Sequence, residues 1–407
     1  MIEMAKELDV DVVRNEFIKY WISNGFVWVK PTSIIPSEYW VDTLFVNSGL
    51  IRYLEIVERE GYLYQSLTTC QPCIKLGSGK FSLDDMVLKD GYFTFFEQLT
   101  CGGGEDVPIA EFIKYIWVYL ESIAGLPKDK IYVGVHSSQS EVMKSWIDAG
   151  ISSKNIIFPD EEAFELDLQS GRIYGVYSPF YYDRGETHPL ACKTAECNIN
   201  CSCGRFLELG DVGIVYKGKA RIIDHGIGLE RITAIARNLE KVNDIEVFQE
   251  IASILRKEIG DKEELPVILM MVVDYIRSAV ILLLSGIKPG NKGRAYVLRA
   301  ILRKTFLLFS KMKVLDCERI RSIILDSSKI IKNSPLFSEV DQETITRELK
   351  DELQKYEELI MRGRKVIRKF LQKRRKNESL DEEEMRFLYE TYGLPAEIVS
   401  DLLKDLS

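Results

Sequence analysis

The sequence predicts an α+β fold, with a domain built on an antiparallel β-sheet over residues 1–240 and an all-helical domain over residues 241–407. Up to about residue 240, short β-prone runs bounded by glycine and serine are interspersed with helical segments, which is typical of an antiparallel sheet with packed helices. Beyond residue 240, the long segments repeat their apolar residues with the period of a helix. A chain of 407 residues is long enough for two domains.

The first domain begins with a predicted helix that follows helical apolar spacing from residue 13 and stops at Gly25. Two further helices are predicted at residues 110–125 and 140–150. The strand predictions rest on alternation and on aromatic or β-branched enrichment. They fall at residues 25–31, 42–49, 92–99, 131–138, 172–183 and 210–218.

The second domain is predicted to consist of helices of different character. The longest apolar stretch, residues 265–275, is interrupted by Asp274 before it reaches the ~20 residues of a membrane span. A long charged helix over residues 341–376 places acids first and bases last, which matches the helix dipole. A final short helix begins near residue 381 and is ended by Gly393 and Pro395. Other helices are expected at residues 245–260, 265–286, 293–313 and 318–334.

The composition is that of a globular protein, with 46% hydrophobic and 29% charged residues. The net charge of −8 gives no global sign of nucleic-acid binding, although a local basic face stays possible. The first ten residues contain acids and lack the apolar core of a signal peptide. We therefore expect a cytoplasmic protein without a membrane partner.

Residues 224–234, DHGIGLERITA, place two glycines just before a helical pattern. Gly226 and Gly228 predict a turn where a ligand can approach the backbone, and Arg231 on the next helix can bind a phosphate through its fork of donors. Asp224 is a candidate to hold a substrate ammonium. On spacing alone, an ordinary glycine turn capped by a surface pair of Glu230 and Arg231 is the alternative.

Four of the eight cysteines lie within twelve residues, 192–203. Thiolates at this density favour a closed tetrahedral Zn²⁺ site with a structural role, and free thiols in a loop are the alternative. His188 is a spare candidate ligand, although a loop histidine is the simpler interpretation. The predicted ligands are Cys192, Cys197, Cys201 and Cys203.

The DHGIGLERITA stretch closely resembles motif 3 of the class II aminoacyl-tRNA synthetases, in the form used by alanyl-tRNA synthetase. Other segments resemble parts of the same family in the same order. In the first domain they are residues 14–26 (first helix), 43–50 (the Phe-x-Asn-Ala-Gly-Met segment), 68–75 and 93–99 (the motif 2 strands), 180–186 and 205–216. Residues 274–305 are the most specific match, and residues 387–395 match the C-terminal landmark of the tRNA-recognition domain.

The resemblance covers nearly the whole chain, and the family's editing and C-terminal oligomerisation domains have no counterpart in it. It therefore implies a compact form without editing, and a monomer, since the oligomerisation domain has no counterpart. Archaeal members of the family carry a similar cysteine-rich insert before the strand that corresponds to residues 205–216, so the resemblance implies an archaeal type.

The resemblance implies that alanine and ATP, with Mg²⁺, form alanyl-adenylate, and that the alanyl group is then transferred to tRNA. Two cations, Lys75 and Arg231, would carry the catalysis by neutralising phosphate charge. The implied ATP-binding residues are Lys75, Phe96, Glu97, Glu230 and Arg231. The implied amino-acid pocket comprises Asn47, Leu50, Asp211, Asp224 and Gly226.

The sequence departs from the family pattern in motif 2 and in the pocket. Lys75 stands where the family has an arginine, which keeps the charge but loses the bidentate fork. Residues 91–93 replace an Arg-His-His group that helps to bind ATP. Asp211 stands in place of an asparagine, and this extra carboxylate could favour a second ammonium or a different amino acid. Leu50 stands in place of a methionine.

The turn and helix at residues 288–304 form the predicted tRNA contact. In the family, an asparagine at this turn and an aspartate in the C-terminal landmark read the G·U pair of the acceptor stem; here they correspond to Asn291 and Glu390. Arg294 and Arg299 would contact phosphates, and Arg303 on the same helix is a further implied tRNA-binding residue. Residues 361–376 add a second basic face. Without the resemblance, a solvated basic helix face would be the usual interpretation.

These observations predict an ATP-dependent, alanyl-tRNA synthetase-like ligase that acts on alanine and tRNA. One alternative is a relative that activates another small amino acid or charges a carrier protein. The other is a non-catalytic tRNA-binding protein. Pyrophosphate exchange measured over all amino acids would separate the three.

Overall fold

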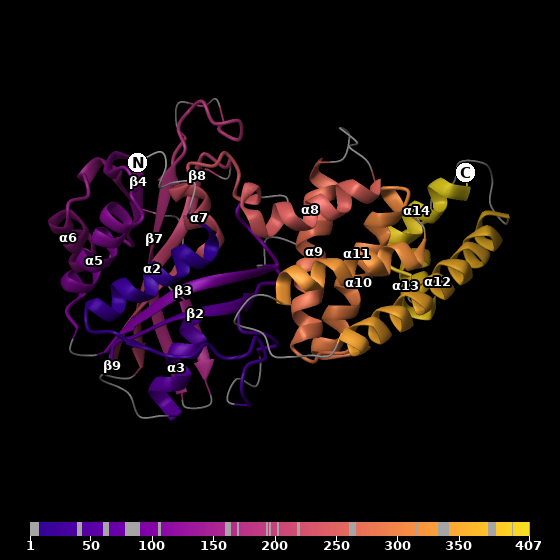
Figure 1. Cartoon of the computed structure of the whole chain (residues 1–407), viewed down its shortest axis with the longest axis horizontal. Helices are drawn as coiled ribbons and strands as arrows, with labels where there is room; N and C mark the ends of the chain where they lie inside the picture. The colour runs from indigo at the N-terminus through magenta and orange to yellow at the C-terminus, as the bar shows by residue number, and fades with distance from the viewer. Residues whose placement is uncertain are drawn as a thin grey trace. The chain divides into compact units, whose positions relative to one another are not determined.

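The computed structural model of the chain divides into two compact units, residues 1–253 and 254–407, and each is described by itself (Figure 1). The division falls inside helix α8 (Glu246–Ile259), whereas the sequence prediction places the boundary before this helix, at residue 240. The described residues are 8–38, 43–59, 65–77, 90–104, 107–158, 164–168, 171–192, 194, 197–201, 203–217, 220–259, 266–314, 316–332, 342–372, 380–392 and 394–406.

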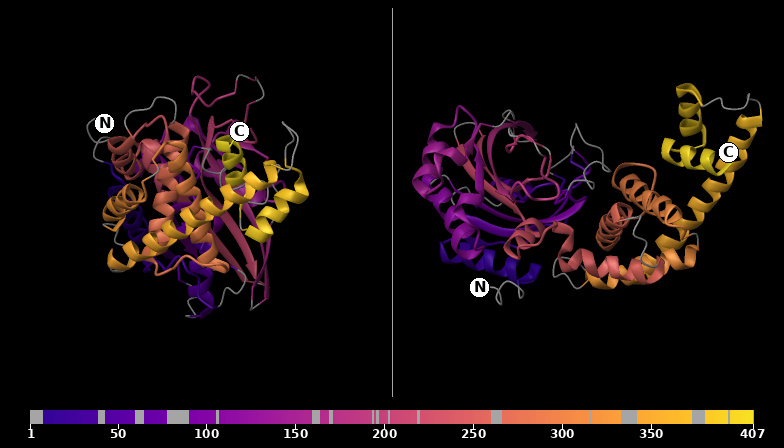
Figure 2. Two further views of the ribbon diagram at one scale, coloured as in Figure 1. Left: turned by 90° about the vertical axis from the view of Figure 1, so that its right-hand side faces the viewer. Right: turned by 90° about the horizontal axis from the view of Figure 1, so that it is seen from above.

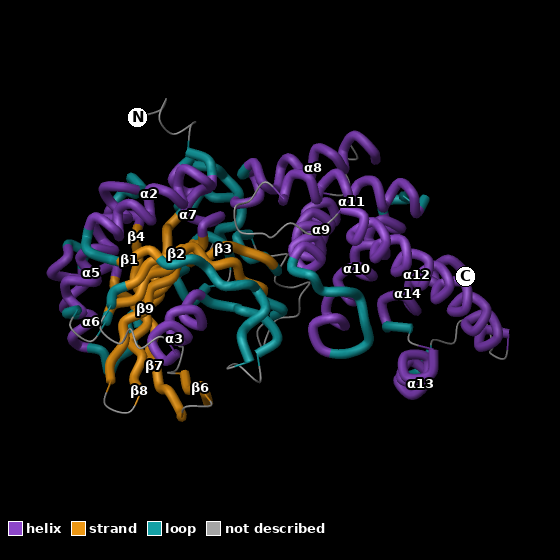
Figure 3. The backbone as a smooth tube through the Cα atoms, turned by 60° about the horizontal axis from the view of Figure 1, so that its bottom comes forward, coloured by secondary structure: helices purple, strands orange, loops and turns teal. Residues whose placement is uncertain are grey.

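The described strands of the first unit form one sheet of nine strands (Figure 3). The strand order is β1-β2-β3-β9-β8-β7-β4-β5, with β6 paired to β7. Adjacent strands are antiparallel except at two places near the edges, where β1 pairs with β2 and β4 with β5 in parallel. The strands are β1 (Val27–Trp28), β2 (Leu67–Ile74), β3 (Phe95–Gly103), β4 (Ile131–Gly134), β5 (Ile156–Ile157), β6 (Phe164–Leu168), β7 (Gly171–Asp183), β8 (Phe206–Lys217) and β9 (Ala220–Gly228). The predicted α+β class with a largely antiparallel sheet is confirmed.

Helices cover both faces of the sheet's centre, so neighbouring residues of β3 meet different surroundings. Helix α2 (Val10–Ser23) lies on one face, where Arg14 reaches Glu97. Helix α5 (Ile109–Val118) packs there too, through Phe112. Helix α3 (Gly49–Arg59) lies on the other face, where it covers the even-numbered residues of β3. The remaining α-helices among the described residues of this unit are α6 (Ser140–Ala149), α7 (Leu229–Ala236) and α8.

Two segments differ from their predicted structure. Residues 43–48 form no strand; instead the backbone of Val46 bonds to Ile34 and Ile74, which leaves this segment as an irregular connection to α3. The predicted glycine turn at Gly226 and Gly228 is the end of strand β9, which pairs with both β3 and β8. The chain passes directly from this strand into α7.

The described elements of the second unit are helices (Figure 2), and the two that follow α9 (Pro266–Leu284) in the sequence pack against it. By length and composition alone Val267–Leu284 could cross a membrane, but 78% of it is buried, as in the core helix of a helical domain. Asp274 and Arg277 within it are buried as well. The other helices are α10 (Gly293–Lys311), α11 (Cys317–Lys332), α12 (Gln342–Gln372), α13 (Glu382–Tyr392) and α14 (Ala396–Leu406).

The end of the chain differs from the prediction, because α13 is followed by a further helix. Leu394, Ile398, Val399 and Leu402 are buried, so α14 contributes to the packing of the unit. Gly393, the predicted helix stop, lies outside the described residues.

Candidate functional site

A pocket of about 250 Å³ opens on the face of the sheet that α3 covers. It lies over the start of β3, the first half of β8 and the end of β9, and the start of α7 closes one side. Its charged side chains are Lys75, Glu208, Asp211, Glu230 and Arg231. The remaining lining residues are Asn47, Ser48, Gly91, Tyr92, Phe93, Phe96, Gln98, Tyr177, Leu209, Gly210, Gly226 and Gly228.

The floor of the pocket requires glycine at residue 226. A Cβ atom at Gly226 would overlap the side-chain amide of Gln98, which lies across this strand position. Gln98 is held there because its Oε1 accepts the backbone N–H of Gly49, at 2.5 Å, at the start of α3. The glycine is thus explained by close packing against a neighbouring side chain, and a turn is not needed to explain it.

Arg231 is braced on the pocket wall by the neighbouring backbone. Its Nε donates to the carbonyl of Gly91 at 2.6 Å, and its Nη1 donates to the carbonyl of Glu208 at 2.7 Å. The guanidinium also lies 4.4 Å from the ring centroid of Tyr92. Glu208 offers only a long ion pair, 3.8 Å from Nη1. A guanidinium held this way keeps its positive charge in a fixed place, which suits the binding of a phosphate.

The opposite part of the pocket is acidic. Asp211 lines it, and Asp224, on the adjacent strand β9, is only 3% exposed. The Oδ1 atom of Asp224 has no hydrogen-bond partner within the part of the chain that the structure describes. Burial, and then the charge of Asp211, raise the pKa of Asp224 well above its usual range. The same two carboxylates, after burial, raise the pKa of the Tyr177 phenol. This region is suited to receiving a cation.

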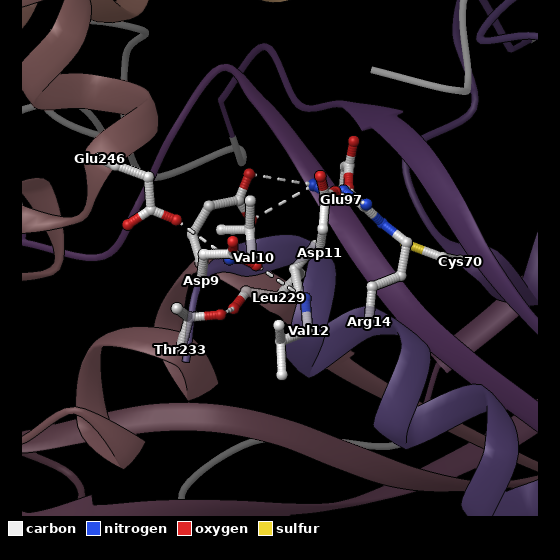
Figure 4. A network of polar contacts seen from close by, with 11 residues as sticks. Asp9, Val10, Asp11, Val12, Arg14, Cys70, Glu97, Leu229, Thr233 and Glu246 are labelled. Atoms are coloured by element: carbon white, nitrogen blue, oxygen red, sulfur yellow. Dashed lines mark hydrogen bonds and ion pairs between the residues drawn. The ribbon is translucent and has the colours of Figure 1, made fainter. Parts of the chain in front are cut away.

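Two of the predicted site residues are not brought to the pocket. Glu97 follows Phe96 in strand β3, so its side chain points to the opposite face. There its carboxylate accepts a hydrogen bond from Nε of Arg14 at 3.1 Å and is paired with Nη2 of the same residue (Figure 4). Leu50 is buried in the apolar cluster of α3 with Val46 and Leu54.

The other predicted residues of this unit lie at or beside the pocket. Asn47, Lys75 and Phe96 line it, with Asn47 and Lys75 exposed. Glu230 lines it too, but its carboxylate accepts the backbone N–H of Glu97 at 3.2 Å, so it fastens α7 to β3. Asp224 lies beneath the lining and not in it.

Seven lining side chains were not among the predicted site residues: Ser48, Tyr92, Phe93, Gln98, Tyr177, Glu208 and Leu209. Gln98 could have been found from strand alternation, because it shares a strand face with Phe96. Glu208 could not, because the register of β8 shifts between Glu208 and Gly210 and interrupts the alternation there. Tyr177 has no local signal, since only the pairing of β7 with β8 brings it beside Gly213.

The four clustered cysteines converge in the described part of the insert. Their sulfur atoms all lie within 4.8 Å of one another, with Cys192 and Cys201 at 3.5 Å and Cys197 and Cys203 at 3.6 Å. Tetrahedral zinc with bonds of about 2.3 Å needs sulfur atoms about 3.8 Å apart, so the residues fit this ion. Hydrogen bonds from Thr194 lower the pKa of the Cys192 thiol to about 6, which favours the thiolate. His188 is engaged elsewhere, with the carbonyl of Glu240.

The predicted tRNA-binding residues lie on α10, on the turn before it, and on α13. Asn291 and Glu390 are exposed, and Arg294 is partly buried. Tyr296 on α10 and Tyr389 on α13 are hydrogen-bonded through their side chains, so these two helices meet next to Glu390.

Arg299 and Arg303 are both engaged within the unit. Each donates from Nε to the carboxylate of Glu352 on α12, at 3.1 Å and 3.0 Å. Arg299 also donates to the side chain of Asn291. The structure therefore brings Asn291 and Arg299 together, in a contact that the sequence prediction did not contain.

Comparison with known proteins identifies the family. Residues 12–407 match the family described as tRNA synthetases class II (A). The chain belongs to this family. It is 26% identical over 413 residues to an alanine–tRNA ligase of Oleidesulfovibrio alaskensis, covering 96% of this chain and 46% of that protein. It is also 26% identical over 424 residues to the alanine–tRNA ligase of Elusimicrobium minutum, covering 97% of this chain and 46% of that protein. The chain thus spans about half the length of these relatives.

Among solved structures, the synthetase chain is similar to apo histidyl-tRNA synthetase of S. aureus, with a TM-score of 0.35 and 12% identity, over 61% of this chain and 74% of that one. The α+β architecture and the antiparallel centre of the sheet are those expected of a class II synthetase domain.

Proposed function

We propose that the first unit activates a small amino acid with ATP, and that the second unit binds the acceptor stem of a tRNA, as in an archaeal-type alanyl-tRNA synthetase. The observation that carries the proposal is the division of charge in one pocket, with a braced guanidinium, Arg231, on one wall and the carboxylates Asp211 and Asp224 at the other. An amino acid and ATP require this arrangement, because the ammonium and the phosphates bind at opposite ends.

In the proposed reaction, a carboxylate oxygen of the amino acid attacks the α-phosphorus of ATP, and the bond to the β-phosphate breaks to release pyrophosphate. Arg231 would hold the terminal phosphate, and Lys75 would neutralise charge at the α-phosphate. Phe96, which lines the pocket, would stack on the adenine ring. The aminoacyl group then passes from the adenylate to the 3′ end of the tRNA, with AMP as the leaving group.

Mg²⁺ would enter with ATP, because this ion binds carboxylate oxygens together with substrate phosphates. Among the lining residues, Glu208 fits it best, since its carboxylate lies on the wall that also holds Arg231. Zinc would be held by the four clustered thiolates, whose closed arrangement favours a structural role in the insert.

The acidic wall favours a second candidate function, the activation of a small amino acid that carries two ammonium groups. A single ammonium balances one carboxylate, whereas Asp211 lines this wall and the buried Asp224 lies beneath it. Burial, and then the charge of Asp211, raise the pKa of Asp224, so a second negative charge beside Asp211 is costly. A second ammonium would remove that penalty.

ATP–pyrophosphate exchange tests both candidates in one experiment. Alanine, glycine, serine and 2,3-diaminopropionate are compared with wild type and with Asp211→Asn. Exchange with alanine that survives in the variant supports the first candidate. A preference for the diamino acid that disappears in the variant supports the second. No exchange with any amino acid would contradict the catalytic proposal and leave RNA binding as the function of the fold.

A further inference from the structure

Arg299 connects three parts of the helical unit. Its Nε donates to Glu352 on α12 at 3.1 Å, its Nη2 donates to the carbonyl of Pro289 at 3.5 Å, and its Nη1 donates to the side chain of Asn291. Arg299 itself belongs to α10 and its side chain is 14% exposed. One guanidinium thus joins the start of α10, the preceding turn and the middle of α12.

The anchor of this connection is buried. Glu352 is 1% exposed and accepts hydrogen bonds from both Arg299 and Arg303. A carboxylate in such a place is strongly favoured to stay paired, because removing its partners would leave a buried charge without compensation. The guanidinium of Arg299 is therefore held in a fixed place relative to the turn.

The contact with Asn291 determines which way its amide faces. An asparagine amide has one accepting oxygen and an NH₂ group with two donors, whereas a guanidinium can only donate. The atom of Asn291 that meets Arg299 must therefore be Oδ1. The two N–H donors of Asn291 are turned away from Arg299, and the residue is exposed.

We propose that Arg299 is a positioning residue for nucleic-acid recognition, which locks the amide of Asn291 so that it offers only N–H donors to the RNA. The inference rests on the proposed tRNA function and gives Arg299 a role different from the predicted phosphate contact. All three nitrogens of its guanidinium donate within the unit, so three of its five N–H donors already hold the turn and α12. An amide locked in this way recognises acceptors on a base edge and rejects donors.

The test uses two short RNA hairpins with an acceptor-type stem, one with a single G·U pair and one with G·C in its place. Dissociation constants are measured by competition for wild type and Arg299→Lys. Lysine keeps the charge but cannot join Glu352, Pro289 and Asn291 at once. We expect the discrimination between the hairpins to fall by at least about fivefold, with the affinity for the G·C hairpin changed less than about twofold.

The matched control is Arg303→Lys, which loses the same kind of bond to Glu352 but does not touch Asn291. It should leave the discrimination unchanged. The second control is Asn291→Ala, alone and combined with Arg299→Lys. If Arg299 acts through Asn291, the lysine substitution should have no further effect on discrimination in the alanine background.

The possible failures can be told apart. If Arg299→Lys weakens both hairpins equally and reduces the salt dependence, Arg299 is a phosphate contact and the inference is wrong. The inference is also wrong if Arg303→Lys abolishes discrimination to the same degree, or if the effects of Arg299→Lys and Asn291→Ala simply add. If wild type binds neither hairpin, the tRNA proposal itself is contradicted, and the inference falls with it.

Discussion

The buried pair of Arg14 and Glu97 provides the sharpest test of how the sheet unit is held together. The two side chains are 9% and 6% exposed, and the pair joins α2 to the strand that carries the pocket (Figure 4). Substituting Arg14→Met preserves most of the side-chain volume but leaves the Glu97 carboxylate buried. Among the described residues, the hydrogen-bond donor that remains beside its side chain is the thiol of Cys70, at 3.7 Å. Breaking one partner of such a pair should destabilise the unit by about 3–5 kcal/mol.

Tryptophan fluorescence measures this effect in the sheet unit alone, because all five tryptophans of the chain lie within its first 146 residues. Urea unfolding of the full chain then gives the free energy of unfolding of this unit. Lys19→Met is the matched control on the same helix, since its pair with Glu16 is exposed and should contribute less than about 1 kcal/mol.

A double variant separates the charge from the packing. Glu97→Met together with Arg14→Met removes the buried charge and should recover most of the lost stability. If the single variant is destabilised by less than about 1 kcal/mol, water must reach Glu97 and the burial argument fails. If the double variant is as unstable as the single one, the loss comes from packing, and the unpaired charge is not its cause.

Three further predictions concern the pocket, the insert and the response to acid. Arg231→Met should remove about 2–4 kcal/mol of transition-state stabilisation, which is measured as a slower pyrophosphate exchange. An unchanged exchange rate would exclude a phosphate role. Purified protein should contain about one zinc per chain. Replacing Cys201 and Cys203 with serine should release the zinc and lower the melting temperature of the protein. A metal analysis that finds no zinc in wild type would contradict this prediction. Burial lowers the pKa of His225 to about 4, so the unfolded chain binds the proton first as the pH falls. The contribution of neutral His225 to the free energy of unfolding is complete above pH ~6.5 and should fall by about 3 kcal/mol between that pH and pH 4. In unfolding followed by fluorescence, His225→Phe should remove this dependence of stability on pH.

Most elements of the fold were predictable, because helical periodicity and aromatic strand composition are local properties. The failure at residues 224–228 has a clear physical reason. Two glycines in five residues are typical of a turn, but here Gly226 belongs to a central strand whose neighbour, Gln98, lies across it. Only the pairing of strands far apart in the sequence reveals such close packing.

The candidate site was predictable in part, and the errors follow from strand geometry. Phe96 and Glu97 are adjacent in β3, so they cannot both point into one pocket. The prediction assigned both to ATP, although alternation alone would have excluded one of them. Which of the two faces the pocket depends on Arg14, since a buried cation on the other face draws the carboxylate there. The pairing of Arg299 with Asn291 was not predictable, because it depends on the place of Glu352 on a helix that begins far along the chain.

The apolar helix α9 has a consequence for the synthesis of the protein. Its partners α10 and α11 follow it in the sequence, and α11 ends at Lys332. α9 is as apolar as a membrane span, and it stays without these packing partners until they have been synthesised. At a translation rate of ~5–20 residues per second, their synthesis takes ~2–10 s after α9 is complete. During this interval it can be captured by other nascent chains or by chaperones. We therefore expect chains that end between residues 284 and 317 to aggregate, whereas the complete helical unit buries this surface.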